Sequence, residues 1–245
     1  MDFITHQDRK LAYCRYEGQG PTVMFFPGFM SDMEGSKALL LDDFCRARGQ
    51  AFVRFDYSGH GKSSGEFAEG TIGQWTEDAL AIIDQLTEGP LLLVGSSMGG
   101  WIALLAALAR KDRVRAYVGL AAAPDFTRDL CWNIYSDEVK ETLKRDGVYY
   151  EPCDYGDDPY PMTLNLLEEG NRHILLDGEI DLNCPVRLIH GMRDPDVPPA
   201  TAQRICDRLT SDDVVISYIK NGDHRLSTDA DLKRLCRIVK GLSGK

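Results

Sequence analysis

Residues 95–99 read Gly-Ser-Ser-Met-Gly and place Ser97 at the centre of a G-x-S-x-G pattern. The pattern directly follows the apolar run 91–94 and opens a helical stretch. A serine on such a tight strand-to-helix turn has strained backbone, so small residues such as Gly95 and Gly99 are needed where the chain reverses. The helix that follows would direct its free N–H groups toward an oxyanion. This context predicts that Ser97 is a nucleophile.

A serine hydroxyl needs a general base near neutral pH, and three histidines lie downstream of the nucleophile: His173, His190 and His224. We favour His224, because it lies in a polar loop, 221–225, that follows the strand-like run 214–219. His190 ends a strand and is expected to serve the turn, and His173 is expected to have a surface or packing role. The order nucleophile, acid, base along the chain supports His224.

The acid that orients the base is expected on the loop after the strand-like run 186–189. Asp194 is our candidate, because residues 194–198 show the spacing D-x-x-V-P. Asp196 and Asp223 are the alternatives, and each would otherwise be a turn or cap residue.

The oxyanion hole requires two backbone N–H groups, one from the residue after the nucleophile and one from the loop after an earlier strand. Met98 is predicted to supply the first. The loop that begins with Pro27-Gly28 is predicted to supply the second, from Phe29. No metal or cofactor is required by this set of residues.

Composition restricts the possible partners. The 245 residues carry a formal net charge of −10, and no Lys/Arg cluster is longer than three residues, which argues against nucleic-acid binding. No stretch of 18 apolar residues is present, so no stable membrane insertion is expected. We expect a small-molecule or acylated substrate. The oligomeric state is not determined by these features.

Seven cysteines are scattered without a C-x-x-C pair, which favours reduced thiols over disulfides or a zinc site. The first residues resemble neither a signal peptide nor a transit peptide. The expected location is cytoplasmic.

Apolar runs alternate with helical patterns, which predicts a mostly parallel central sheet with helices on both faces. Together with the order of the three candidate residues, this arrangement is typical of the α/β-hydrolase fold. Residues 1–124 and 185–245 are expected to form the core, and 125–184 a lid or cap insertion without a convincing buried strand. The expected strands are 22–26, 51–55, 91–94, 114–120, 186–189 and 214–219, and the expected helices are 36–48, 71–86, 98–110, 199–208 and 229–240.

Trp101 and Trp132 are our candidates for substrate contact. The aromatic residues of the insertion, Trp132 among them, either line an acyl pocket or form the core of the lid itself. Arg128 and Arg172 are candidates for accepting an anionic leaving group, although a solvated surface role fits both. Residues 61–63, Gly-Lys-Ser, resemble the end of a phosphate-binding loop, but Asp56 occupies the position of the required first glycine.

Several stretches resemble one branch of the α/β-hydrolases, which contains the animal mitochondrial depalmitoylases that also act as acyl-glucuronide esterases. These stretches are 27–28, 55–59, 71–75, 95–101, 183–192 and 223–225. The resemblance covers most of the chain and is weakest in the insertion. It implies hydrolysis of thioesters such as S-palmitoyl cysteine and of activated carboxyl esters, and it matches Ser97, Asp194 and His224 to the triad of that branch. The different insertion and the lack of a transit peptide favour a bacterial cytosolic relative.

We therefore expect a serine hydrolase that cleaves carboxylic esters or thioesters through an acyl-Ser97 intermediate. A perhydrolase or a C–C bond hydrolase could use the same triad. A ligand-binding protein with a catalytically silent fold is the alternative from a different class, and a complete triad argues against it.

Overall fold

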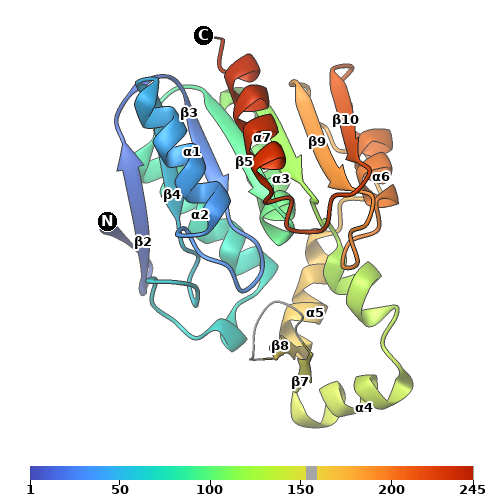
Figure 1. The fold of residues 1–245 in the computed structure, drawn as a ribbon. Coiled ribbons are helices and arrows are strands. Elements are labelled where there is room, and N and C mark those ends of the chain that lie inside the picture. Colours follow the sequence, from blue (N-terminus) through green and yellow to red (C-terminus); the bar gives the residue numbers. More distant parts are fainter. Residues whose placement is uncertain (153–158, 245) are drawn as a thin grey trace.

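The computed structural model describes residues 1–152 and 159–244 (Figure 1). Eight strands form its large sheet: β1 (Asp2–His6), β2 (Arg9–Tyr16), β3 (Gln19–Phe26), β4 (Gln50–Phe55), β5 (Leu91–Ser96), β6 (Val114–Leu120), β9 (Val186–Gly191) and β10 (Val214–Ile219). Their order is β1-β2-β4-β3-β5-β6-β9-β10. The strands from β4 to β10 pair in parallel, and β1 and β2 add an antiparallel edge.

Helices cover both faces of this sheet: α1 (Ser36–Ala47), α2 (Ile72–Leu86), α3 (Met98–Ala109), α6 (Ala200–Arg208) and α7 (Asp229–Leu242). Two short 3-10 turns, Phe67–Glu69 and Lys111–Arg113, precede α2 and β6. Helices α1 and α7 lie on one face, and α2, α3 and α6 lie on the other (Figure 1). The predicted mostly parallel sheet with helices on both faces is confirmed.

Strand β5 shows why its sequence is almost uniformly apolar. Leu91 and Leu93 belong to the core under α2 and α3, whereas Leu92 and Val94 belong to the core under α1 and α7. All four side chains are fully buried. Because successive residues of a strand point to opposite faces, a strand between two helical layers needs apolar residues at every position.

The insertion between β6 and β9 contains more secondary structure than its sequence indicates. Its described elements are a π-helical turn (Thr127–Trp132), α4 (Asp137–Asp146), β7 (Val148–Glu151), β8 (Tyr160–Thr163), α5 (Leu164–Gly170) and a 3-10 turn (Asn171–His173). Strands β7 and β8 pair antiparallel, with Tyr149 opposite Met162. The expectation of no convincing buried strand missed this pair, in which Met162 and Thr163 of β8 are buried. The two strands have only four residues each, and Pro161 lies within β8, so neither leaves a clear strand pattern.

A buried carboxylate joins the two ends of the insertion. Asp125, whose φ is 62°, accepts hydrogen bonds from the amides of Leu175 (2.9 Å) and Leu176 (2.8 Å). Two further bonds dock the insertion onto the core. The indole of Trp101 donates to the carbonyl oxygen of His173 (3.1 Å), and the amide of Gly73 donates to Oε2 of Glu169 (3.0 Å). Residues 169–173 of the insertion are thus hydrogen-bonded to both α2 and α3.

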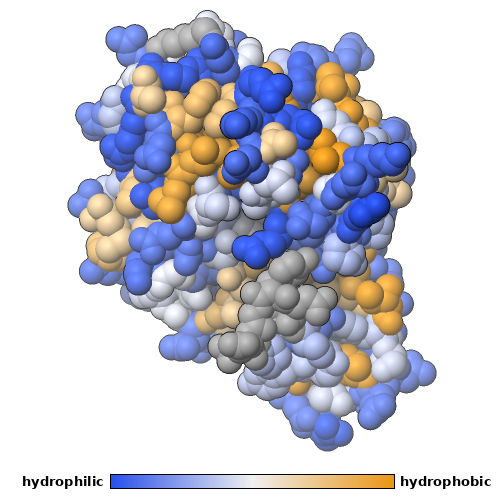
Figure 2. All heavy atoms as spheres, in the orientation of Figure 1, coloured by the Kyte–Doolittle hydropathy of each residue, from blue (hydrophilic) through white to orange (hydrophobic). Residues whose placement is uncertain are grey.

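The visible surface is largely hydrophilic, and the described cysteines are free thiols. Figure 2 shows hydrophilic residues spread over this face of both the sheet domain and the insertion, with apolar residues grouped in smaller patches between them. Six of the seven cysteines are free thiols, and Cys153 lies outside the described residues. Within the described ranges, none of the helices has the length and apolar character needed to cross a membrane.

Candidate active site

Three predicted site residues lie at one edge of the sheet. Ser97 follows β5, Asp194 lies in the loop after β9, and His224 lies in the loop after β10. In the order β5-β6-β9-β10 these strands are parallel near neighbours, so their carboxyl ends open onto the same edge. Residues that are 127 positions apart in the chain are therefore brought within hydrogen-bond distance.

The nucleophile elbow has the strained backbone that its sequence predicts. Ser97 has φ 54° and ψ −124°, a conformation that a residue with a side chain adopts only under constraint. Its neighbours supply that constraint. The amide of Ser97 donates to the carbonyl oxygen of Leu120 (2.9 Å), and the amide of Ala123 donates to the carbonyl oxygen of Ser97 (3.1 Å).

The glycines of the elbow are required by close backbone approaches. A Cβ atom on Gly95 would collide with the carbonyl oxygen of Gly99 and lie 2.6 Å from the Cα of Gly100. A Cβ atom on Gly99 would collide with the carbonyl oxygen of Phe26 at the end of β3. Both glycines that the motif requires therefore have a steric reason.

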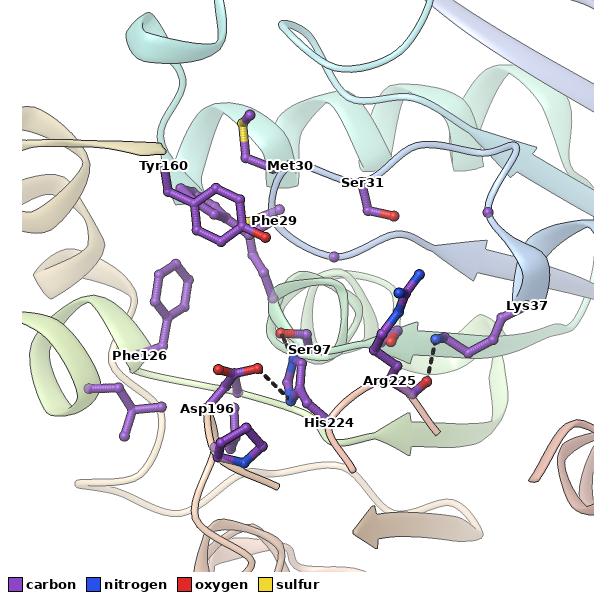
Figure 3. A pocket seen from close by; sticks show the side chains of 18 of the residues that line it. Phe29, Met30, Ser31, Lys37, Ser97, Phe126, Tyr160, Asp196, His224 and Arg225 are labelled. Carbon is purple, nitrogen blue, oxygen red and sulfur yellow. Dashed lines mark hydrogen bonds and ion pairs between the residues drawn. The ribbon is translucent and has the colours of Figure 1, made fainter. Parts of the chain in front are cut away.

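Ser97, His224 and Asp194 form one continuous chain of hydrogen bonds. Nε2 of His224 lies 3.0 Å from Oγ of Ser97 (Figure 3), and Nδ1 of His224 lies 2.9 Å from Oδ2 of Asp194. Asp196, the alternative acid, approaches Nδ1 only to 4.0 Å, and its side chain is 38% exposed where that of Asp194 is fully buried. Asp194, and not Asp196, is therefore the carboxylate within hydrogen-bond distance of His224. Asp223 accepts a hydrogen bond from the amide of Leu226 (2.9 Å), which makes it a turn residue.

A second histidine holds the Asp194 carboxylate. Nε2 of His190 lies 3.3 Å from Oδ2 of Asp194 and 2.9 Å from the carbonyl oxygen of Val197. Oδ1 accepts from the amides of Asp196 and Val197, both at 2.9 Å. Burial of Asp194 favours the neutral acid, but the hydrogen bonds from His190, His224 and Val197 outweigh it and hold the pKa of Asp194 well below its ordinary value of 3.8. His190, which was predicted to serve the turn, thus also contacts the carboxylate of Asp194.

Ser97 and His224 border a cavity of about 690 Å³. One part of its wall is apolar, and another part is polar and contains Ser31, Lys37 and Arg225 (Figure 3). The apolar part contains Phe29, Phe126, Leu130, Ile134, Tyr160 and Met162. Four of these six residues belong to the π-helical turn, to β8 or to the link between them, so the insertion forms much of the apolar wall.

The loop after β3 passes directly beside the nucleophile. A Cβ atom on Gly28 would lie 3.4 Å from the Cβ of Ser97. Phe29 and Met98, the predicted oxyanion-hole residues, both line the cavity. The ring of Phe29 packs edge-to-face on Phe67 and Phe126, at centroid distances of 4.8 and 5.8 Å. These contacts fix the turn from which the Phe29 amide would point.

The two tryptophans predicted to contact substrate lie outside the described wall of the cavity. Trp101 is fully buried and packs edge-to-face on Phe126, with ring centroids 5.8 Å apart. Trp132 is half-buried, and the Nζ atom of Lys140 lies over its ring at 5.7 Å. Trp101 therefore lies behind the cavity wall and does not line the cavity as predicted. The physical reason is that α3 turns this side chain into the core, where it supports Phe126.

Two further candidates of the insertion, His173 and Arg128, have structural partners. Nε2 of His173 pairs with Oε1 of Glu169 at 2.5 Å, in keeping with the predicted packing role. Arg128 forms ion pairs with Asp129 (2.7 Å) and Asp177 (2.5 Å), so it is committed to the insertion itself. The cations that do line the cavity are Lys37 and Arg225, and neither is among the predicted site residues.

One set of residues has the composition of a metal site. Ligand atoms of Asp194, Asp196 and His224 lie within 4.8 Å of one another. Two of these residues are already hydrogen-bonded to each other, and His224 presents its second nitrogen to Ser97. The donor atoms are thus used within the hydrogen-bond chain, which fits acid–base chemistry better than metal coordination.

Comparison with known proteins agrees with this architecture. The family model described as serine aminopeptidase, S33, matches residues 20–144. The mitochondrial palmitoyl-protein thioesterase ABHD10 of Bos taurus is 41% identical over 247 residues, covering 100% of this chain and 80% of that protein. The solved structure of mouse alpha/beta hydrolase domain-containing protein 10 superposes with a TM-score of 0.91 at 39% identity, covering 98% of this chain and 97% of that one. A solved structure from Agrobacterium vitis S4 gives a TM-score of 0.94 at 38% identity, with coverages of 99% and 97%.

These similarities confirm the predicted fold and the resemblance to the depalmitoylase branch of the α/β-hydrolases. They extend over the insertion, where the sequence patterns were weakest. The chain belongs to the palmitoyl-protein thioesterase ABHD10 family of α/β-hydrolases.

Proposed function

We propose that this protein hydrolyses carboxylic esters and thioesters, with Ser97 as nucleophile, His224 as general base and Asp194 as orienting acid. The observation that carries the proposal is the hydrogen-bond chain from Ser97 through His224 to Asp194, with distances of 3.0 and 2.9 Å, at the wall of a 690 Å³ cavity. Catalytic serine, histidine and aspartate are recognised by this geometry rather than by sequence position.

In the first half-reaction, Oγ of Ser97 attacks the acyl carbonyl carbon while Nε2 of His224 takes the hydroxyl proton. The amides of Phe29 and Met98 stabilise the resulting oxyanion. When the tetrahedral intermediate collapses, the bond to the leaving sulfur or oxygen breaks, and His224 gives its proton to the leaving group. The thiol or alcohol departs, and the acyl group remains on Ser97.

In the second half-reaction, His224 removes a proton from a water molecule, which attacks the acyl-Ser97 carbonyl. Collapse of this second intermediate returns the proton to Ser97 and releases the carboxylic acid. The buried carboxylate of Asp194 holds the imidazole in the tautomer with its proton on Nδ1 and stabilises the imidazolium that forms in each half-reaction. The steps use these side chains and water without a cofactor.

The apolar wall favours substrates with an extended acyl chain. Phe29, Phe126 and Tyr160 stand together, with edge-to-face contacts from Phe29 to the other two rings at 5.8 and 5.7 Å. The ABHD10 relatives are named palmitoyl-protein thioesterases. We therefore propose that this chain acts on fatty acyl thioesters, including S-acylated cysteine.

The test is turnover of matched acyl thioesters and oxyesters by the purified protein. We expect both to be hydrolysed, with kcat/KM higher for an octanoyl than for an acetyl group. Vinylogous diketones, assayed in parallel, report on C–C bond hydrolysis. If neither ester class is turned over by protein with an intact fold, the proposal is wrong.

We also propose a cytoplasmic location. Its support is the free state of the six described cysteines and the absence of C-x-x-C pairs in the sequence. The ABHD10 relatives are named as mitochondrial. Fractionation of cells that express the tagged chain distinguishes these two locations.

A further inference from the structure

Lys37 makes a long-range contact that the catalytic scheme above does not use. It lies in the first turn of α1, and its Nζ donates to the carbonyl oxygen of Arg225 at 2.6 Å and to Oγ of Ser227 at 3.3 Å. Ser227 donates its own hydroxyl to the same carbonyl oxygen at 2.9 Å. Figure 3 shows Lys37 reaching to the loop that carries His224. The carbonyl group next to the proposed base therefore has two donors.

The His224 loop needs such a restraint, because part of it is strained. Leu226 has φ 46°, although it is not a glycine, and its side chain is 1% exposed. A non-glycine residue in this region costs free energy and persists only where its surroundings impose it. Part of the restraint comes from the burial of Leu226 and from the hydrogen bond that its backbone amide donates to Asp223. The hydrogen bond from Lys37 is accepted by the carbonyl oxygen of Arg225, the residue between His224 and the strained Leu226.

The loop is held from its other side as well. The amide of Arg193 donates to the carbonyl oxygen of Gly222 at 2.9 Å, which ties the segment before His224 to the loop after β9. Lys37 ties the segment after His224 to α1. Helix α1, which carries Lys37, begins immediately after the loop that contains Phe29. Lys37 therefore joins the loop that carries His224 to the loop predicted to hold the oxyanion.

We propose that Lys37 is a positioning residue for His224: its ammonium group holds the Arg225 carbonyl and thereby the direction of the imidazole toward Ser97. This inference rests on the proposed function and deepens it. Lys37 lies in the polar wall of the cavity, yet its role here does not require contact with substrate.

The charge of this lysine depends on its surroundings. Burial and the like charge of Arg225 lower the pKa of Lys37 from 10.5 to about 8, against the opposing effect of two carboxylates. These are Asp223 in the same loop and Asp231 in α7. The contact between Lys37 and Arg225 is thus charge-assisted at neutral pH and becomes a bond from a neutral amine above about pH 8.

A charge-assisted hydrogen bond is roughly twice as strong as a neutral one. We therefore expect kcat to decline above pH 8, by roughly fivefold, as this restraint weakens. The decline is not expected to come from unfolding. Between about pH 8 and 10.5 the unfolded chain keeps the Lys37 proton that the folded chain has lost, so this group makes the folded state more stable as pH rises.

The experiment compares K37M, K37R and R225Q with the wild type by kcat, KM and melting temperature from pH 6 to 10. K37M should lower kcat by roughly tenfold at pH 7, with little change in KM or melting temperature and without the alkaline decline. K37R should recover part of the rate and show no decline, because arginine stays charged. R225Q should move the alkaline decline to higher pH, because it removes the like charge and keeps the backbone carbonyl.

K233M, which changes an exposed lysine of α7, is the matched control and should behave as the wild type. The inference is overturned if K37M keeps both the wild-type kcat and the alkaline decline. It is also overturned if K37M loses activity and melting temperature together and K37R recovers neither. Labelling of Ser97 by a fluorophosphonate separates the two proposals. If the wild type is labelled and K37M behaves as the wild type, only the positioning role is contradicted. If the wild type is neither labelled nor active, the proposed function is contradicted.

Discussion

His190 and His224 approach the same oxygen atom of Asp194. Nε2 of His190 lies 3.3 Å from Oδ2 of Asp194, and Nδ1 of His224 lies 2.9 Å from that oxygen. The His190 side chain is 1% exposed and that of Asp194 is fully buried, so water cannot replace either contact. His190 therefore helps to determine where the carboxylate meets the proposed base.

Replacing His190 tests this relationship. H190F keeps an aromatic ring and removes the donor, so kcat should fall by roughly 10- to 100-fold, because the carboxylate loses a buried hydrogen bond. H190Q, whose amide nitrogen can take the place of Nε2, should retain more activity than H190F. Melting temperatures identify any general loss of fold. Equal kcat values for H190F and the wild type would show that His190 serves only the turn.

The choice between the two acids is tested by paired asparagine variants. D194N should lower kcat by about 10⁴-fold, because the imidazole is then held in the wrong tautomer. D196N should lower kcat by less than about tenfold, because Asp196 lies 4.0 Å from Nδ1 and is partly exposed. A larger loss for D196N than for D194N would reverse the assignment.

Asp194 also predicts a pH dependence of stability. Its hydrogen bonds hold the pKa of the folded protein below the ordinary value of 3.8, so the folded state favours the carboxylate. The stabilisation is complete above the pKa of the unfolded chain and is lost as pH falls through the lower pKa of the folded protein. The wild type should therefore unfold at higher urea concentration than D194N at pH 6, and the difference should shrink as pH falls below about 4. A difference that grows on acidification would contradict this sign.

The apolar wall predicts a dependence on acyl chain length. Each buried methylene contributes up to about 0.8 kcal/mol, so four added carbons could raise kcat/KM by at most roughly 200-fold before the wall ends. F126A should flatten this response, because Phe126 lines the cavity. W132F is the control, because Trp132 lies outside the described wall. A series from acetyl to palmitoyl thioesters, below their micelle concentrations, measures the slope. A flat response in the wild type would remove the acyl-pocket interpretation.

The sequence predicts the hydrogen-bonded residues well because each follows a recognisable strand. Ser97 lies on a motif, and Asp194 and His224 come directly after two apolar runs, so the parallel sheet brings them to one edge. The partners of these residues are harder to predict. Lys37 contacts a backbone carbonyl 188 positions away, and His190 contacts Asp194 only because the loop between them curls back.

Trp101 and the insertion show a second limit of sequence patterns. Trp101, a candidate for substrate contact, lies in α3, where the helix period turns its side chain toward the core. Strands β7 and β8 are stabilised by pairing with each other and by packing against the core, and neither contribution leaves a long pattern in the sequence. The composition of the insertion was enough to predict that it forms an apolar wall, but not to predict which of its residues line the cavity.

In the proposed mechanism Ser97 carries the acyl group, and His224 activates the Ser97 hydroxyl. Reaction with a fluorophosphonate, followed by mass analysis of the digested protein, tests this most directly. We predict one adduct on Ser97 in the wild type, no adduct and a kcat roughly 10⁴- to 10⁶-fold lower in S97A, and strongly slowed labelling in H224A. An adduct on a different residue, or S97A that keeps more than about a tenth of the wild-type kcat with an intact fold, would contradict the account.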